Sequence, residues 1–442
     1  MTIVFIENRY KTFLYEPIAL ELKKLGYKIH WLIQNKEFSP KSNEFENHVL
    51  PFPEKGSVEK NDPLIEEIIK IDRQQNHFNK KEKSYFYFYD KKIEQILNEI
   101  KPNFIFGEAT VFHELLTIKY CQEKQILFLN PSSCRYPVGR FSFYLNDTLI
   151  PYLGSNEILE DKEAEKIVNS IIQRSIIPNY MNPLKVNKIG IVYDKYLKVK
   201  SYVRGERYNT PNPIVKFLKE KKRKTKITNW NSKSVTKINE KDKKFKVLYP
   251  LQMQPESSID VYGKDFIDQT NLIKEIYKSL PENCELFIKP NPKSNLELTQ
   301  ELLDFVESEN NVIHLHHLSK MEDVLSKVDL VVTVTGTVAI ECILSNVPII
   351  TLVESINDYC QNCKYISSIS EIPKVIKTIL NETFPIIDMN KKVNFINELN
   401  KTSFKGIVSD PFSDPNCINE SNIEDLLIAF KIILDSRNNN PI

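Results

Sequence analysis

Short apolar segments of β-strand length alternate with segments of helical periodicity along most of this chain. In the first half, four strands are expected, at residues 2–7, 28–34, 103–107 and 126–130. The alternation resumes at residue 245, with five further strands expected at 245–250, 284–290, 311–315, 330–335 and 347–353. Strands that alternate with helices are typical of parallel, doubly wound sheets. The sequence therefore predicts an α/β protein with two such sheets.

A polar, lysine-rich segment at residues 226–244, which lacks helical periodicity, separates the two alternating regions. A chain of 442 residues exceeds the size at which one hydrophobic core keeps growing, so two domains are expected. We place a Rossmann-like N-terminal domain at 1–184, a basic helical or linker segment at 185–244 and a second Rossmann-like domain at 245–375. The remaining residues, 376–442, are expected to be helical and to pack back across the domains.

Positive charge is concentrated in the middle of the chain. The whole sequence has a formal net charge of +2, whereas residues 185–246 hold 20 Lys or Arg against 5 Asp or Glu. Such a block indicates a polyanionic partner or an anionic membrane surface, and a solvated flexible linker explains it equally well.

The sequence also bears on the location of the protein. No apolar run approaches the roughly 18 residues that cross a bilayer, and the first residues do not resemble a signal peptide. Seven scattered Cys fit a reducing compartment. We expect a cytoplasmic protein, and the basic segment leaves peripheral attachment to the inner face of the cytoplasmic membrane open.

The most informative motif follows the strand predicted at 330–335. Thr335, Gly336 and Thr337 lead directly into a helix that carries Glu341 about one turn later. Glycine lets a ligand approach the backbone, and the free N–H groups of a first helical turn favour phosphate. Glu341 would suit the hydroxyls of a ribose. A threonine-capped helix with a surface glutamate is the alternative explanation.

Two other strand ends of the second region carry polar side chains. Lys289, Asn291 and Pro292 follow one strand, where a lysine and an amide on a proline-stiffened loop could contact a phosphate. Gln252, Gln254 and Glu256 follow another, and glutamine amides could recognise a base or a sugar hydroxyl. Rigid loops with solvated side chains would give the same patterns.

In the first region, Glu108 follows a strand directly after Gly107. A carboxylate at a strand end could act as a general acid or base. Arg135 and Arg140 flank a Pro/Gly turn and could bind an anion, although surface salt bridges explain them equally well.

Several cofactor motifs are missing from the sequence. It contains no GxGxxG, no GxxxxGK[ST] and no DxD, which argues against a dinucleotide-dependent dehydrogenase, a P-loop kinase and a metal-dependent transferase. The Cys360–Cys363 pair has no second Cys pair near it, and His314, His316 and His317 lack neighbouring ligands at metal spacing. We expect no cofactor and no metal site.

Together these motifs resemble the capsule polysaccharide biosynthesis family, which includes bacterial Kdo transferases. The resemblance spans roughly residues 100–355 and keeps the order of the motifs: the Gly107 to Glu108 pair, the segments 135–140, 252–256 and 289–292, and the helix start 336–341. One difference is Asn291, which stands where the family usually has His and cannot carry a positive charge.

The resemblance implies a GT-B-like fold, with two Rossmann-like domains that face a cleft, and a nucleotide-activated donor without an obligatory metal. Carried over, it assigns the nucleotide to seven residues: Lys289, Asn291, Pro292, Thr335, Gly336, Thr337 and Glu341. Gln252, together with Gln254 and Glu256 of the same segment, and the Arg135/Arg140 pair would face the donor sugar. Glu108 would be the catalytic carboxylate.

The function that we expect is glycosyl transfer to a bacterial capsule, O-antigen or other surface-glycan acceptor, which could be linked to a lipid. Kdo-related members suggest a CMP-linked ulosonic acid as donor. Two alternatives stay open. One is a UDP-sugar 2-epimerase or polyol-phosphate transferase of the same fold, and the other is a non-catalytic partner subunit. No nucleic-acid partner is expected.

Overall fold

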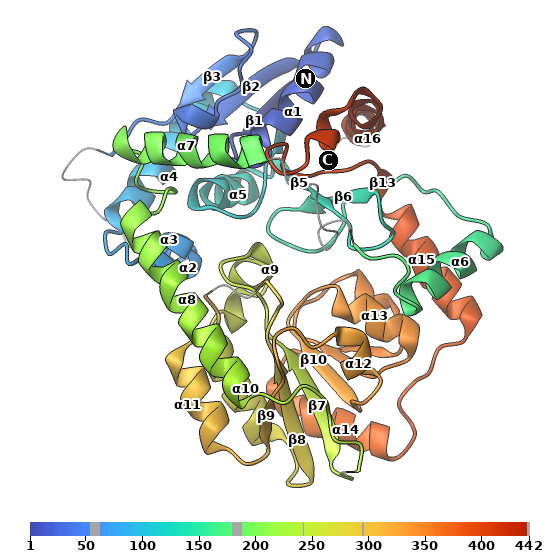
Figure 1. Ribbon diagram of the computed structural model, residues 1–442. Helices are drawn as coiled ribbons and strands as arrows, with labels where there is room; N and C mark the ends of the chain where they lie inside the picture. The colour runs from blue at the N-terminus through green and yellow to red at the C-terminus, as the bar shows by residue number, and fades with distance from the viewer. Residues whose placement is uncertain (54–61, 179–187, 242, 294–295, 440–442) are drawn as a thin grey trace. The chain divides into compact units, whose positions relative to one another are not determined.

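The computed structural model describes residues 1–53, 62–178, 188–241, 243–293 and 296–439 (Figure 1). The chain forms two compact units, each with its own sheet and hydrophobic core. The first unit consists of Met1–Leu159, Ile177–Pro213 and Asn397–Ile442, and the second of Glu160–Ile176 and Ile214–Ile396. The chain therefore passes from one unit to the other four times.

The first unit is built on a mixed sheet in the order β13-β6-β5-β4-β1-β2-β3. Its strands are β1 (Thr2–Ile6), β2 (Lys28–Ile33), β3 (Glu46–Val49), β4 (Phe104–Phe106), β5 (Leu127–Ser133), β6 (Arg140–Leu145) and β13 (Phe404–Lys405). Strands β1 to β5 pair in parallel, whereas β6 and β13 add antiparallel ladders at one edge. The parallel part has the strand order of a Rossmann-like sheet.

Helices cover this sheet and complete its core. They are α1 (Thr12–Lys24), α2 (Pro63–Ile71), α3 (Arg73–Phe78), α4 (Ser84–Ile100), α5 (Phe112–Lys124), α7 (Lys188–Val203) and α16 (Glu420–Asn439). The C-terminal helix α16 belongs to this core because its Phe430 packs on Phe5, Phe106 and Phe143, with ring centroids 4.8–6.1 Å apart. Aromatic packing of this kind buries much apolar surface.

The second unit contains a fully parallel sheet in the order β12-β11-β10-β7-β8-β9. Its strands are β7 (Phe245–Pro250), β8 (Cys284–Lys289), β9 (Val312–His314), β10 (Leu330–Thr333), β11 (Ile349–Thr351) and β12 (Cys363–Tyr365). The helices are α6 (Asp161–Ile172), α8 (Pro213–Lys233), α9 (Ser257–Asp260), α10 (Gln269–Ser279), α11 (Gln300–Ser308), α12 (Met321–Leu325), α13 (Val338–Ser345) and α14 (Ile372–Leu380). A further helix, α15 (Met389–Lys401), crosses the limit between the units.

The predicted fold class is confirmed. Both sheets are doubly wound and Rossmann-like, and the C-terminal segment is helical, as expected for a GT-B-like protein. The unit limits differ from the expected boundaries, because residues 160–176 group with the second unit and α16 with the first. Helix α6 contacts α13, and α16 contacts α1, so packing over long sequence separations sets these limits.

The basic segment is largely helical, apart from residues 185–187 and 242, which lie outside the described residues. The polar stretch from 226 onward was expected to lack periodicity, whereas α8 continues to Lys233. Its anchor is Trp230, which is fully buried and donates from Nε1 to the carbonyl of Leu315 (2.8 Å). One buried residue does not produce an apolar stripe, which is why the sequence pattern missed this part of the helix.

Candidate functional site

In the second sheet, the strand order reverses between β7 and β10. Gln252 follows β7, and its Nε2 donates to Thr333 Oγ1 (3.1 Å) and to the carbonyl of Thr335 (3.0 Å) beyond β10. The next residue, Gly336, has a φ of +112°, which other residues rarely adopt. Ligands of doubly wound sheets bind beyond the carboxyl ends of the strands at this switch point. The structure thus brings Gln252, Thr335 and Gly336 together where a ligand is expected.

Helix α13 begins directly after this turn and carries Glu341 in its first turn. The Glu341 carboxylate forms an ion pair with the guanidinium of Arg174, and both side chains are largely buried, at 9% and 16% exposure. Arg174 follows α6, far from Glu341 in the sequence. Thr337 occupies the N-cap position of α13. The ion pair with Arg174 therefore fixes the position of the Glu341 carboxylate at the first turn of α13.

Lys289 lies at the end of β8 and is 3% exposed. Its Nζ donates to the carbonyl of Pro290 (3.3 Å), and no ion pair joins it to any residue that the structure describes. Burial and the nearby Arg174 lower the pKa of Lys289 to about 8. Burial lowers the pKa of His317, and the nearby His316 and Lys289 lower it further. Arg174 and His317 are therefore both close enough to Lys289 for their charges to interact with it.

The remaining predicted residues of the second unit differ in what they can offer a ligand. Asn291 accepts the backbone N–H of Lys293 at its Oδ1 (2.8 Å), which closes a turn. A ligand would therefore meet the amide nitrogen of Asn291. Pro292 is exposed on the same loop. Neither side chain shows an interaction with the Glu341–Arg174 pair.

Gln254 and Glu256 belong to the framework of the loop after β7. Gln254 is buried, donates to Asp260 Oδ1 (2.8 Å) and the carbonyl of Ile267 (2.9 Å), and accepts from Gln269 (3.0 Å). Glu256 is the N-cap residue of α9, and its backbone N–H donates to the carboxylate of Asp260, the last residue of this helix. Gln254 is thus committed to holding the loop that presents Gln252.

The first sheet has its own switch point between β1 and β4, and a pocket lies there. Its lining comes from the loops after β1, β2 and β4, from the starts of α3 and α5 and from the segment between α7 and α8: Glu7, Asn8, Arg9, Tyr10, Gln34, Asn35, Arg73, Thr110, Val111, His113 and Asn209. The sequence motifs did not single out Glu7, Arg9, Tyr10 or Arg73. The nearest sequence signal was the strand predicted at 2–7, which ends at Glu7 and precedes Arg9 and Tyr10, and no such signal marks Arg73.

This pocket gathers buried titratable groups. Burial raises the pKa of Glu7 to about 8, whereas Arg9 lowers the pKa of Tyr10 to about 8. Burial lowers the pKa of His113 to about 4, so its ring is neutral at pH 7. Arg9 is 8% exposed, and its guanidinium has no hydrogen bond or ion pair with any residue in the described part of the chain. Arg9 and Arg73 make the pocket suited to an anionic group.

Glu108 lies beside this pocket, after β4. Its Oε1 is 3.3 Å from Nζ of Lys11, and both side chains are more than four-fifths buried. The neighbouring Glu114 accepts hydrogen bonds from Asn8 and from Thr110, and burial together with Glu108 raises its pKa to about 7. The strand end therefore holds two adjacent carboxyl groups, of which Glu114 is occupied by the loop.

Arg140 has a structural role in place of the predicted anion clamp with Arg135. Its guanidinium donates to Glu157 (2.8 Å), to Ser155 (2.9 Å) and to Ser403 and the carbonyl of Asn400 (2.8–3.1 Å). These bonds tie β6 to the segment after α15. Because its donors are used within the first unit, Arg140 offers little to a ligand. Arg135 is partly exposed on the preceding loop.

Comparison with known protein families finds a match in the middle of the chain, over less than half of its length. Residues 166–359 match the family model described as capsule polysaccharide biosynthesis protein. The resemblance inferred from the motifs is confirmed. The matched segment includes Arg174, Gln252, Lys289 and Glu341, whereas Glu108 and the Arg135/Arg140 pair lie outside it. No curated protein matches the sequence.

Solved structures give only distant likenesses. The UDP-GlcNAc 2-epimerase of Methanocaldococcus jannaschii is 12% identical, covers 90% of this chain and 98% of its own, and gives a TM-score of 0.29. MurG of Acinetobacter baumannii is 10% identical over 91% and 96% of the two chains, with a TM-score of 0.26. The spinosyn rhamnosyltransferase SpnG is 9% identical over 91% and 98%, with a TM-score of 0.27. Such values carry no information on substrates.

The exposed surface of α7 is a further feature with a bearing on function. Among the described residues, no helix has the length and apolar character needed to span a membrane. Helix α7 nevertheless exposes Ile189, Val192, Tyr196 and Val203, which are 57–84% exposed and recur every three, four or seven residues. These side chains form an apolar stripe on one face of the helix.

Proposed function

We propose that this protein is a glycosyltransferase whose second unit binds a nucleotide-activated sugar. The observation that carries the proposal is Lys289, a buried ammonium group beside Arg174 that lacks an anionic partner among the described residues. Buried charges in proteins are paired or bind ligands, because an isolated charge is costly. The phosphate of a donor would supply the missing negative charge.

The donor nucleotide would lie across the switch point of the second sheet. Backbone N–H groups at Gly336 and Thr337 would face the phosphate, and the Glu341 carboxylate, held by Arg174, would accept hydrogen bonds from the ribose. The amide nitrogen of Asn291 would add a donor near the phosphate, and Gln252 would contact the sugar. The match to the capsule biosynthesis family supports this arrangement. A CMP-linked ulosonic acid is the donor that we favour.

The acceptor would bind in the first unit. Glu108 would act as general base and take the proton of the acceptor hydroxyl as its oxygen attacks the anomeric carbon of the donor. The bond from that carbon to the phosphate oxygen breaks, and the nucleotide leaves with the electron pair. Arg174, Lys289 and the first turn of α13 would stabilise the leaving phosphate. No step in this scheme requires a metal ion or a cofactor.

We also propose that α7 attaches the protein to the inner face of the cytoplasmic membrane. Its apolar stripe is accompanied by exposed Lys188, Lys195 and Arg204. An amphipathic helix with basic flanks binds anionic lipid surfaces. Attachment would bring the enzyme to a lipid-linked glycan acceptor.

The first experiment is a thermal-shift panel with CMP, CDP, UDP, GDP and dTDP. A ligand that binds the native state alone stabilises it by about 2.7 kcal/mol at a hundred times its Kd. We expect a selective shift with CMP that is lost in Glu341→Gln and kept in Lys293→Gln, an exposed lysine near the same loop. A selective shift with UDP would change the proposed donor nucleotide from CMP to UDP but would leave the proposed glycosyltransferase activity in place.

Activity then separates the remaining functions. Incubation with the selected nucleotide sugar should release nucleotide only when an acceptor glycan is present. Conversion of a UDP-sugar to its epimer without acceptor would establish the epimerase alternative. If no nucleotide shifts the melting temperature, the protein is better explained as a non-catalytic subunit.

A further inference from the structure

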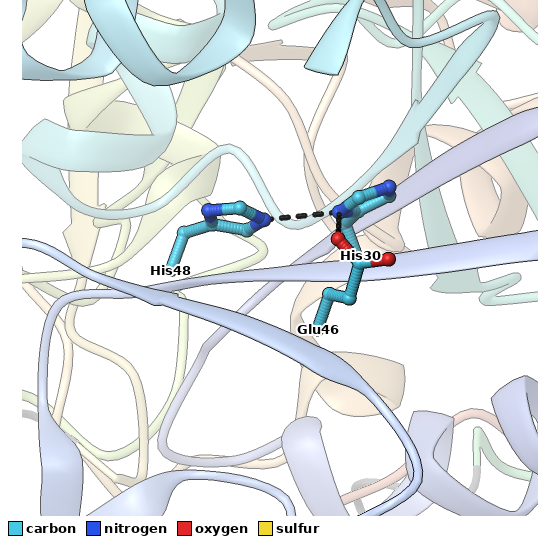
Figure 2. Close-up of side chains that lie close together, drawn as sticks. All are labelled: His30, Glu46 and His48. Carbon is cyan, nitrogen blue, oxygen red and sulfur yellow. Dashed lines mark hydrogen bonds and ion pairs between the residues drawn. The ribbon is translucent and has the colours of Figure 1, made fainter. Parts of the chain in front are cut away.

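Three potential metal ligands meet on two neighbouring strands of the first sheet, away from the candidate site. His30 lies on β2, and Glu46 and His48 lie on the edge strand β3 (Figure 2). The register pairs His30 with Glu46 and Leu32 with His48. Because side chains alternate along a strand, residues 30, 46 and 48 share one face of the sheet.

The ligand atoms are close enough for one ion. Nδ1 of His30 lies 2.9 Å from Nε2 of His48 and 3.4 Å from Oε2 of Glu46, and the three candidate ligand atoms all lie within 4.8 Å of one another. In a tetrahedral zinc site with bonds of roughly 2.0–2.2 Å, ligand atoms are separated by about 3.3 Å. The observed separations bracket this value, so shifts of a few tenths of an ångström would admit an ion.

The other oxygen of Glu46 has a separate partner. Oε1 lies 3.6 Å from Nζ of Lys28, whereas Oε2 faces His30. Such an outer contact orients a coordinating carboxylate, so an ion could bind Oε2 without displacing Lys28.

A hydrogen bond between the two imidazoles is the simpler explanation of this cluster. It leaves Nε2 of His30 buried and without a partner among the described residues, whichever ring donates. An ion bound at Nδ1 would leave Nε2 in the same state, so this atom does not separate the two explanations. The position of Glu46 Oε2 does, because it also faces Nδ1 of His30, and an imidazole pair has no need of this third group, whereas an ion would be bound by all three.

We infer that His30, Glu46 and His48 form a binding site for a divalent transition-metal ion, with zinc as the first candidate. Two imidazoles and one carboxylate select such ions over magnesium or calcium, which prefer oxygen ligands. Three protein ligands leave a fourth position for water. His30 and Glu46 lie in the amino-terminal parts of their strands, whereas Glu7 and the pocket lie beyond the carboxyl ends. The ion would therefore join the four-residue edge strand β3 to β2 and would take no part in glycosyl transfer.

The test is calorimetric titration of ZnCl2 into the full-length protein after removal of metals with EDTA. We expect one ion per chain, with an affinity that falls at least about tenfold in Glu46→Gln and in His48→Gln. Glu44→Gln changes a neighbouring exposed carboxylate outside the cluster and should bind zinc like the unaltered protein. Circular dichroism establishes that each variant is folded, and the exposed position of Glu46 makes its variant the safer one.

Cobalt provides a second measurement. Co²⁺ bound by nitrogen and oxygen ligands should give visible d–d absorption that disappears in His48→Gln, without the near-ultraviolet bands of cysteine thiolate ligands. Absence of zinc binding, or equal binding in both ligand variants, would overturn the inference. The nucleotide-induced thermal shift should persist in Glu46→Gln, so failure of the metal site leaves the proposed donor site untouched.

Discussion

At the scale of single residues, the charge of Lys289 leads to a pH prediction. Its pKa is lowered from 10.5 to about 8 by burial and by Arg174, so the ligand-free protein loses this proton as the pH rises through about 8. A bound phosphate stabilises the protonated form and raises the pKa. Affinity for CMP should be highest below pH 8 and then fall about tenfold per pH unit up to the pKa of the complex.

Calorimetric titrations between pH 7 and pH 9.5 measure this effect. CMP is a suitable ligand because its phosphate, with a second pKa near 6, is already largely ionised over this range. Lys289→Met should bind more weakly with a flat pH profile, and Lys293→Met should keep the profile of the unaltered protein. An unchanged slope in Lys289→Met would show that another group is responsible.

The Arg174–Glu341 pair leads to a second residue-scale prediction. Removing one partner of a largely buried pair leaves the other charge uncompensated, which costs on the order of 3 kcal/mol when burial is complete. At exposures of 16% and 9%, we expect a smaller loss of unfolding free energy from Arg174→Ala or Glu341→Ala, about 1–3 kcal/mol. The double variant should lose less than the sum of both. Denaturant unfolding of the unaltered protein, the two single variants and the double variant measures the coupling free energy between the two side chains. Strictly additive losses would show that the ion pair contributes nothing to stability.

The sequence predicted one side of this site and missed the other. Gln252, Lys289, Thr335 and Glu341 follow strands of a predictable sheet, and parallel strands place their carboxyl ends at one edge. Arg174 follows helix α6 and lies 167 residues before Glu341 in the sequence. No local pattern reports a partner at that separation. The acceptors of Arg140 in the segment 400–403 are likewise not evident from the turn that contains it.

At the scale of elements, α7 leads to a prediction about lipid binding. Ile189, Val192 and Val203 are at least 66% exposed on one face, next to basic side chains. We expect the protein to sediment with vesicles that contain anionic lipid, and to be released as salt rises. Val192→Asp combined with Val203→Asp should weaken binding at least about tenfold, because two apolar anchors are replaced by anions.

Leu380→Asp is the matched control for this experiment. Leu380 is 63% exposed at the end of α14, in the other unit. This variant should bind vesicles like the unaltered protein. Equal binding to neutral and anionic vesicles, or full binding by the double α7 variant, would contradict attachment through this helix.

Elements with strong patterns were predicted well, and short or polar ones were not. The limits of β7 agree with prediction, and those of β8 and β10 differ by one or two residues, because these apolar strands are buried on both faces. Strands β3, β12 and β13 are only two to four residues long at sheet edges, and they escaped prediction, as did the six-residue strand β6. Such strands owe their conformation to a neighbouring strand more than to their own sequence.

At the scale of the whole molecule, the number of sheets was predictable and the course of the chain between them was not. Alternation of strands and helices indicates one sheet in each half of the sequence. The chain crosses between the two units four times, and these crossings depend on which of the two sheets α6, α8 and α16 each pack against. Trp230 of α8 and Phe430 of α16 are fully buried, and each belongs to the core of its own unit. Only the folded packing shows which sheet each helix covers.

The last prediction separates the two units by their response to a nucleotide. A ligand suppresses local opening of the segments that it contacts, by the same mass action that raises the overall stability. Hydrogen exchange should therefore slow most at residues 250–254, 334–341 and 172–176, which carry Gln252, Glu341 and Arg174. Glu341→Gln at the same nucleotide concentration should lose this protection. Protection centred on the loops of Arg9 and Thr110 would place the nucleotide in the first unit and would reverse the roles proposed for the two sheets.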